Sequence, residues 1–332
     1  MFSSPTEHAT DDPETAPAGH ASRRGLAAAV LAVPIVVVVL LSAFAWAAAE
    51  IAPRNLPIGV AGPAELTAGL AAAAPGGPAA LDLTTYAVRG AAEAAIRDRE
   101  IYGAIAVGPD GPVVITASGS SPLIAQLLVQ MATGATSGTL PEVVDLVPAD
   151  PDDPRGAAFG ALALPLVLGG VALGAVTSFV LRGRLERVAA LLLGSAVAGL
   201  AAVAVIQGWL GVVSGSWLAN AGVLSLVLLA AGAALAGLAA VAGRAGYLAG
   251  ALLLMLVGNP FSALTSAPEL LPEPWGAIGQ AMPLGAGGWL LRSTAFFDGR
   301  GVGASVWVLV IWAVAGLALV GLARRRRTHA HP

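Results

Sequence analysis

The chain contains no cysteine and no lysine among its 332 residues. Without cysteine it cannot form a disulfide, a thiolate metal site or a cysteine nucleophile. Without lysine it cannot form a P-loop, because that motif uses a lysine after its glycines to reach the nucleotide phosphates. A process driven by ATP would therefore need an ATPase on a separate chain.

Charged residues are scarce as well. They make up 11% of the chain, against 57% hydrophobic residues, and the mean hydropathy is +0.80. A soluble globular protein of this composition would have too few polar side chains to cover its surface. We therefore expect a membrane protein that is mainly α-helical and has lipid around it.

Histidine occurs only near the two ends of the sequence, at His8, His20, His329 and His331. Two imidazoles in a tail lack a third ligand, so no metal site is predicted. No histidine lies in the middle of the chain, so a serine, histidine and acid triad cannot form there. Asp98 and Glu100 flank Arg99, and we interpret them as a solvated charged face. No catalytic residue and no cofactor site are predicted.

The first long apolar run extends from Gly25 to Ala49 and follows two arginines, Arg23 and Arg24. At 1.5 Å per residue it is long enough to cross a hydrocarbon core of about 30 Å, and the arginines favour a cytoplasmic start. Residues 1–22 have almost no large apolar side chain and are predicted to be a disordered cytoplasmic tail. The double arginine also permits a cleaved export signal, but the run exceeds the 7–15 apolar residues typical of such signals.

Residues 50–156 have a different texture, in which short β-like runs alternate with alanine-rich helical stretches. The order βαβαββαβ predicts a small α/β domain with helices packed on a mixed sheet. The predicted strands are 56–60, 80–86, 101–107, 113–117 and 142–147, and the predicted helices are 64–74, 88–99 and 121–132.

Five more apolar segments follow and complete a predicted set of six transmembrane helices. They are 157–181, 188–210, 218–242, 247–267 and 303–323, and a basic cytoplasmic tail at 324–332 ends the chain. The segments assigned to the cytoplasm hold ten arginines and five acidic residues, whereas segment 50–156 holds five arginines and twelve acidic residues. This asymmetry obeys the positive-inside rule. It predicts a multi-pass protein of the plasma membrane with both termini in the cytoplasm and the α/β domain outside.

The fifth of these spans is unusual. Its apolar part, 247–257, corresponds to only about 16 Å of helix, and Asn259-Pro260 should interrupt it. Because the alternation of arginines requires a crossing here, we expect the helix to kink at Pro260 and to continue to about Ala267. Residues 268–302 are then expected to lie at the external membrane surface or to re-enter the membrane.

Within the predicted spans the polar residues are neutral. Ion-coupled carriers usually bury a group that changes charge at mid-membrane, so this absence argues against a self-energised transporter. These neutral residues include Thr177, Ser178, Ser195, Gln207, Ser225 and Asn259. Gly170 with Gly174, and Gly246 with Gly250, have the spacing that allows helices to pack closely.

Three groups of residues resemble a known family. Leu56-Pro57-Ile58-Gly59-Val60 follows the first span, and Tyr102-Gly103-Ala104-Ile105-Ala106-Val107 resembles a strand of the same external domain. The segment before the last span contains Asn259-Pro260-Phe261-Ser262, Leu271-Pro272 and Met282-Pro283 to Phe297. With one span, a large external domain and five further spans, the layout resembles the permease subunits of type-2 ABC exporters, in particular the bacterial branch that contains the phage infection protein.

The resemblance implies a permease-like subunit that acts as a homodimer or heterodimer with a separate ATPase and exports a hydrophobic or cell-envelope-related substrate. The expected ATPase contact is the short turn with Arg182, Arg184, Glu186 and Arg187, although these residues are also explained as topology anchors. Asn259, Pro260 and Pro283 are the expected gate or helix break, unless the kink is static.

The alternative function is that of a non-transporting envelope protein whose external domain binds a protein, a polymer or a phage. Under either hypothesis membrane lipid is a partner, nucleic acid is not, and the chain itself is not an enzyme.

Overall fold

The computed structural model describes residues 19–108, 111–135 and 141–322. Most of tail 1–22 and all of tail 324–332 lie outside these residues. The chain divides into two units, Met1–Ser42 and Ala43–Pro332, which we describe separately. Helix α1 (Gly19–Ala49) passes from the first into the second, and it begins within the segment expected to be a tail. In the first unit its apolar side chains from Val30 to Leu41 are almost all exposed.

The second unit contains the predicted mixed sheet. Its strands are β1 (Leu56–Ala61), β2 (Leu81–Thr85), β3 (Gly103–Gly108), β4 (Gly111–Thr116) and β5 (Glu142–Asp145). They lie in the order β2-β1-β3-β4-β5, with β3 and β4 antiparallel and the other neighbours parallel. The expected order of strands and helices in this domain is therefore confirmed.

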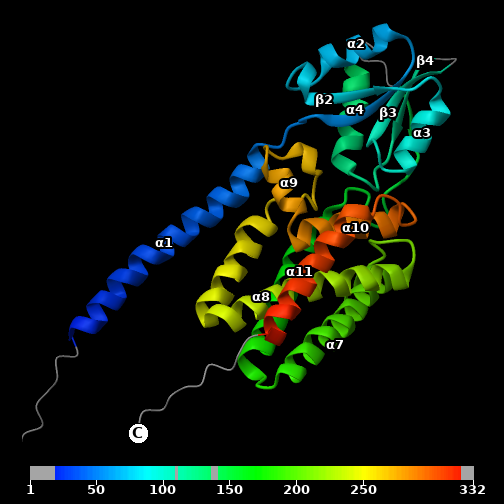
Figure 1. Cartoon of the computed structure of the whole chain (residues 1–332). Helices are drawn as coiled ribbons and strands as arrows, with labels where there is room; N and C mark the ends of the chain where they lie inside the picture. The colour runs from blue at the N-terminus through cyan, green and yellow to red at the C-terminus, as the bar shows by residue number, and fades with distance from the viewer. Residues whose placement is uncertain (1–18, 109–110, 136–140, 323–332) are drawn as a thin grey trace, which may run out of the picture. The chain divides into compact units, whose positions relative to one another are not determined.

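Helices cover both faces of the sheet (Figure 1). On one face α2 (Ala64–Ala73) and α4 (Pro122–Ala135) bury Leu70, Ile124 and Leu128 against alternate residues of β1. On the other face α3 (Arg89–Arg97) buries Ala92 and Ile96. This arrangement follows from the two-residue period of a strand, which sends successive apolar side chains to opposite faces.

The rest of the second unit is a bundle of apolar helices. Its main elements are α5 (Ala157–Ala161), α6 (Ala163–Ala175), α7 (Arg184–Val203), α8 (Trp217–Leu253) and α11 (Gly303–Leu322). Short π-helical segments, Val176–Val180, Ala204–Trp209 and Leu254–Gly258, continue α6, α7 and α8. Five helices among the described residues, α1 included, are long and apolar enough to cross a membrane. The chain is therefore a mainly helical protein of membrane-embedded type.

Helix α8 lies at the centre of the bundle and packs against α6, α7, α10 (Pro283–Phe296) and α11 (Figure 1). It reverses direction at Gly243, where φ is 64° and ψ is −144°, a conformation open essentially only to glycine. Tyr247 then packs against Ala231 and Leu235. Two antiparallel arms result, so the expected boundary between helices 218–242 and 247–267 falls at a glycine and not at a loop.

The second arm of α8 ends earlier than expected. Helical structure stops at Gly258, and residues 259–267 form turns, so the predicted continuation to Ala267 is wrong. Pro260 has no backbone donor to extend the helix. The carbonyl oxygen of Asn259 instead accepts hydrogen bonds from Ser262 N (3.3 Å) and Ser262 Oγ (2.8 Å), which turns the chain away.

Glycines set the distances between these helices. A Cβ on Gly170 would lie 2.6 Å from the Cβ of Ala231, and one on Gly174 would lie 2.8 Å from that of Leu235. A Cβ on Gly250 would lie 2.6 Å from Leu238 Cδ1. The prediction that these glycines allow close helix packing is confirmed, since each faces a neighbouring helix at a separation too small for a side chain.

Candidate functional site

One end of the helix bundle is formed by a connected segment, residues 259–302, which we call the elbow. It contains a short 3₁₀ turn (Pro268–Leu270), α9 (Trp275–Gln280) and α10. A Cβ on Gly276 would collide with the carbonyl of Pro268, and one on Gly279 with the carbonyl of Phe261. The elbow is therefore folded tightly on itself and is not an open loop.

The sequence-predicted gate positions lie beside residues that are in contact with one another. A Cβ on Gly258, at the end of the α8 arm, would lie 3.8 Å from Cβ of Met282, which directly precedes α10. Pro283 is buried at the first turn of α10, and Gln280 Nε2 donates to Ser262 O at 3.1 Å. Asn259, Pro260 and Pro283 thus lie around one packed turn. These contacts fit a static kink as well as a movable gate.

The α/β domain is joined to the elbow by direct hydrogen bonds. Tyr102, at the start of β3, donates to Glu269 Oε2 at 2.6 Å, and Arg300 is paired with Asp98 at 2.9 Å. Burial, together with the neighbouring Glu269 carboxylate, raises the pKa of the Tyr102 phenol well above its ordinary value. The phenol therefore remains a hydrogen-bond donor at neutral pH.

Arg99 is the central residue of this junction. It has a left-handed backbone (φ 63°), which follows the end of α3, and its Nη1 donates to Trp289 O at 2.9 Å. Its guanidinium lies 3.8 Å from the ring centre of Trp289 and 4.9 Å from that of Phe297. Burial lowers its pKa to about 9, and its Nε and Nη2 atoms are shielded from solvent without a hydrogen-bond partner. Asp98 and Glu100 are exposed, as expected for a solvated charged face, whereas Arg99 between them stacks on two aromatic rings.

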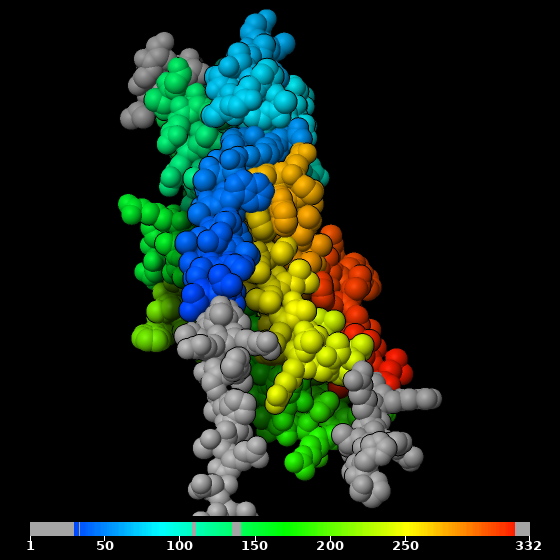
Figure 2. Space-filling view, turned by 90° about the vertical axis from the view of Figure 1, so that its left-hand side faces the viewer, coloured from blue at the N-terminus to red at the C-terminus, as the bar shows by residue number. Residues whose placement is uncertain are grey.

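The chain that leads from α1 into β1 is also attached to the elbow. Ala52 N and Arg54 N donate to the carbonyl oxygens of Leu270 (3.0 Å) and Glu269 (2.9 Å), and Arg54 Nη1 donates to Leu270 O at 2.9 Å. Figure 2 shows the orange elbow packed beside this blue segment. The domain and the elbow are consequently joined through two separate parts of the domain.

Arg292, on α10, fixes the elbow from inside. Its side chain is only 6% exposed, and it donates to Ala263 O (3.4 Å) and Leu264 O (2.5 Å) while stacking on Phe159 at 4.5 Å. From the sequence, Arg292 is expected in an external loop without a particular role. Its position as the single charge in an otherwise uncharged run, 284–297, was the signal that it is held by specific partners.

A network of neutral polar side chains connects α10 with the helix bundle. Asn220 Nδ2 donates to Gln207 Oε1 (3.0 Å) and Ser214 O (2.8 Å), and Thr294 Oγ1 donates to Asn220 Oδ1 (2.7 Å). Asn220 is fully buried. These side-chain bonds join groups near the ends of α7, α8 and α10, so Asn220 positions these ends relative to one another.

The predicted ATPase-contact turn joins α6 to α7, and its residues have unequal roles. Glu186 accepts from Gly183 N at 3.0 Å, and Arg187 donates to Leu181 O (3.1 Å) and Ser178 O (3.2 Å). These two residues therefore cap helix ends. Arg182 and Arg184 are at the surface, and Leu185, which follows Arg184 in α7, is 86% exposed.

No group of three or more histidine, aspartate or glutamate residues suited to a metal ion occurs in the described part of the chain. Comparison with known proteins found no matching family model, no similar curated protein and no similar solved structure.

Proposed function

We propose that this protein is a permease-like subunit of an exporter of the type-2 ABC class, working with an ATPase on another chain. In this proposal the chain crosses the membrane six times, with both termini in the cytoplasm and the α/β domain outside. The crossings are α1, α6, α7, the two arms of α8 and α11, together with the π-helical extensions of α6, α7 and α8.

The observation that carries the proposed threading is the attachment of the α/β domain to the elbow. Because Tyr102 bonds to Glu269 and Arg99 to Trp289, the two segments must lie on the same side of a membrane. Between them the chain passes through α6, α7 and α8. If α8 crossed once, they would lie on opposite sides, whereas two arms divided at Gly243 return the chain to the same side.

The shortness of the second arm of α8 also indicates that the elbow dips into the membrane. Residues 244–258 form about 22 Å of helix, less than the roughly 30 Å of a hydrocarbon core. The elbow that follows would then begin below the external surface. This position suits its buried apolar helices and the lining of an exit path for a hydrophobic or envelope-related substrate.

The energy for transport is proposed to come from a separate ATPase chain. Among the described residues, the charged residues of the membrane-type helices lie in the first turns of α1 and α7 and beside Gly243 in α8, so none offers a mid-helix proton or ion relay. The chain also has no lysine for a P-loop. Arg182, Arg184 and the exposed Leu185 form the tip of the cytoplasmic turn and are proposed to contact the ATPase. Dimerisation of the permease, with itself or a relative, belongs to the same proposal.

Cysteine labelling tests the threading, because the natural chain has no cysteine to give a background. Single variants Glu65→Cys in the domain and Glu273→Cys in the elbow should both react with a membrane-impermeant maleimide on intact cells. Arg244→Cys and Leu185→Cys should react only after permeabilisation. If Glu65→Cys and Glu273→Cys are labelled from opposite sides of the membrane, α8 does not cross the membrane twice.

Affinity purification from native membranes tests the ATPase contact. We expect a P-loop ATPase to be recovered with the wild-type protein and to be lost from the double variant Arg182→Glu, Arg184→Glu. The control is the double variant Arg89→Glu, Arg97→Glu, which reverses two exposed arginines on the external helix α3 and should retain the ATPase. If mass spectrometry finds no ATPase with the wild type at equal membrane levels, the non-transporting alternative is favoured.

A further inference from the structure

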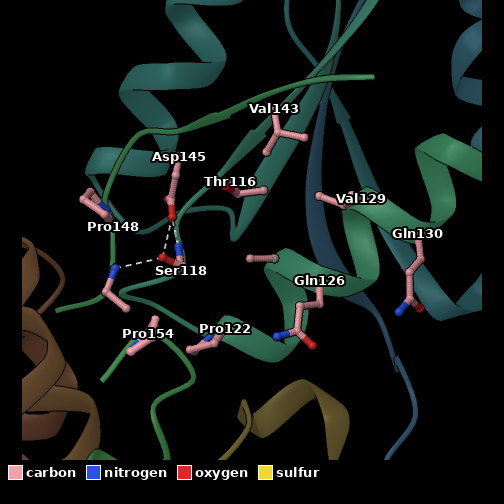
Figure 3. Close-up of a pocket in the computed structure, with 12 residues that line it drawn as sticks. Thr116, Ser118, Pro122, Gln126, Val129, Gln130, Val143, Asp145, Pro148 and Pro154 are labelled. Carbon is pink, nitrogen blue, oxygen red and sulfur yellow. Dashed lines mark hydrogen bonds between the residues drawn. The ribbon is translucent and has the colours of Figure 1, made fainter. Parts of the chain in front are cut away.

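The α/β domain contains a groove between the edge strand β5 and helix α4 (Figure 3). Its volume is about 550 Å³. Val143 and Asp145 of β5 and Thr116 of β4 line one side, and Gln126 and Val129 of α4 line the other. Pro148 and Pro154 lie at one end, where Ser118 Oγ bonds to Asp145 Oδ2 and accepts from Ala149 N. Strands β4 and β5 therefore form one wall of the groove, and helix α4 forms the other.

Among the residues that the structure describes, strand β5 is the last strand of the sheet and has no neighbouring strand on its side away from β4, which we call its free edge. It pairs in parallel with β4 through the register Thr116↔Asp145, and Leu146 N donates to Thr116 O at 2.8 Å. In a parallel ladder alternate residues direct both main-chain groups to the neighbouring strand, so Val144 and Leu146 face β4. The main-chain N–H and C=O groups of Val143 and Asp145 therefore point outward, away from the sheet.

The opposite wall has the spacing that an extended chain needs. Gln126 and Gln130 lie one turn apart on α4, a rise of about 6 Å, and both line the groove. In an extended strand, residues that share a face repeat about every 6.6 Å. A strand added beside β5 would place successive side chains between β5 and α4, each near one glutamine carboxamide, which both donates and accepts hydrogen bonds.

Charge indicates the kind of strand. The lining residues include Asp145 and no arginine. The surrounding segment 50–156 holds twelve acidic residues and five arginines, a net charge of −7. A basic peptide would be attracted to this surface and an acidic one repelled.

We propose that this groove binds an extended, basic peptide segment of a partner protein, which adds as a strand to the free edge of β5. Main-chain hydrogen bonds to Val143 and Asp145 supply the alignment. Small apolar or hydroxyl side chains at alternate positions fill the space against Val129 and the glutamines. The proposal concerns the external domain and does not depend on transport.

The test uses the full-length protein in detergent and fluorescence anisotropy. The probe is a labelled eight-residue peptide of alternating threonine and valine with a lysine at each end. Val143→Pro removes the outward donor of β5 without removing a β4 ladder bond, since proline is tolerated on the free side of an edge strand. It should weaken binding on the order of tenfold. Thr85→Pro makes the matched change at the other sheet edge, β2, and should leave binding unchanged.

Two further comparisons separate strand addition from non-specific attraction. Two peptides carry N-methyl groups on alternate residues, one at the odd positions and the other at the even positions. One of them should lose binding and the other should keep it, because only every second N–H of an added strand faces β5. Gln126→Arg, at the groove wall, should weaken the lysine-ended peptide and strengthen a glutamate-ended one. The proposal is overturned if the peptide fails to bind, if Val143→Pro binds like wild type while melting normally, or if both methylated peptides behave alike. It is also overturned if a chitin-derived tetrasaccharide occupies the groove and the peptide does not.

Discussion

Gly316→Ala in α11 should destabilise the helix bundle by about 3 kcal/mol, the upper part of the range for overpacking a close contact. The added Cβ would fall on the backbone of Ala233 and Ala234 in α8, closer than real Cβ atoms approach. Backbone cannot rotate away as a side chain can, so α8 and α11, the most extensively packed pair of helices, would have to separate. Gly237 in α8 faces Gly316 from the other side, and its own Cβ would lie 2.9 Å from Gly316 O.

The control for this change lies in the same helix. A Cβ on Gly321 would meet no atom within 4 Å, so Gly321→Ala should be neutral or slightly stabilising, as alanine favours helix over glycine. Thermal unfolding of the two variants in the same detergent, followed by size-exclusion chromatography of the heated samples, measures the difference. Equal melting temperatures would show that the contact between α8 and α11 does not hold the bundle together.

Arg292→Ala should cost about 3 kcal/mol, because it leaves a cavity and removes the donors of two buried carbonyl groups. The carbonyls belong to Ala263 and Leu264, and the guanidinium also stacks on Phe159. The loss should appear as a lower melting temperature and as earlier protease cleavage within residues 259–267, the turn that Arg292 holds.

Arg300→Ala is the matched control. Arg300 lies at the end of the same elbow but is about half exposed, and its ion pair with Asp98 therefore contributes much less than the contacts of Arg292. Arg292→Lys should recover part of the stability, because one ammonium can still donate to a carbonyl but cannot stack on Phe159 as a planar group does. Wild-type stability of Arg292→Ala would show that the elbow is held by packing alone.

Most of the architecture follows from local pattern. Long uncharged runs predict helices of membrane type because no soluble protein can cover so much apolar surface, and the alternation in 56–147 predicts the mixed sheet. The helix break at Asn259-Pro260 is also a local property, because it depends on one missing backbone donor. The expected continuation to Ala267 was wrong, since the Ser262 bonds to the Asn259 carbonyl give no signal in composition or period.

The site residues divide in the same way. Arg182 and Arg187 are equal members of a basic turn in the sequence, yet only the folded turn directs Arg187 to the carbonyls of Leu181 and Ser178. Arg99 and Arg292 looked like ordinary external charges. Their burial depends on partners far along the chain, Trp289 for Arg99 and Phe159 for Arg292, which no local spacing brings together.

The sequence by itself determined that this protein has membrane-type helices, an α/β domain between the first and second of them, and a proline break late in the chain. These properties depend on hydropathy, period and backbone chemistry over a few neighbouring residues. The tertiary structure alone decided that α8 folds back at Gly243, that the domain is fastened to the elbow through Arg99 and Tyr102, and that a groove opens beside β5. Each of these needs contacts between residues distant in sequence, where packing and not local preference selects the outcome.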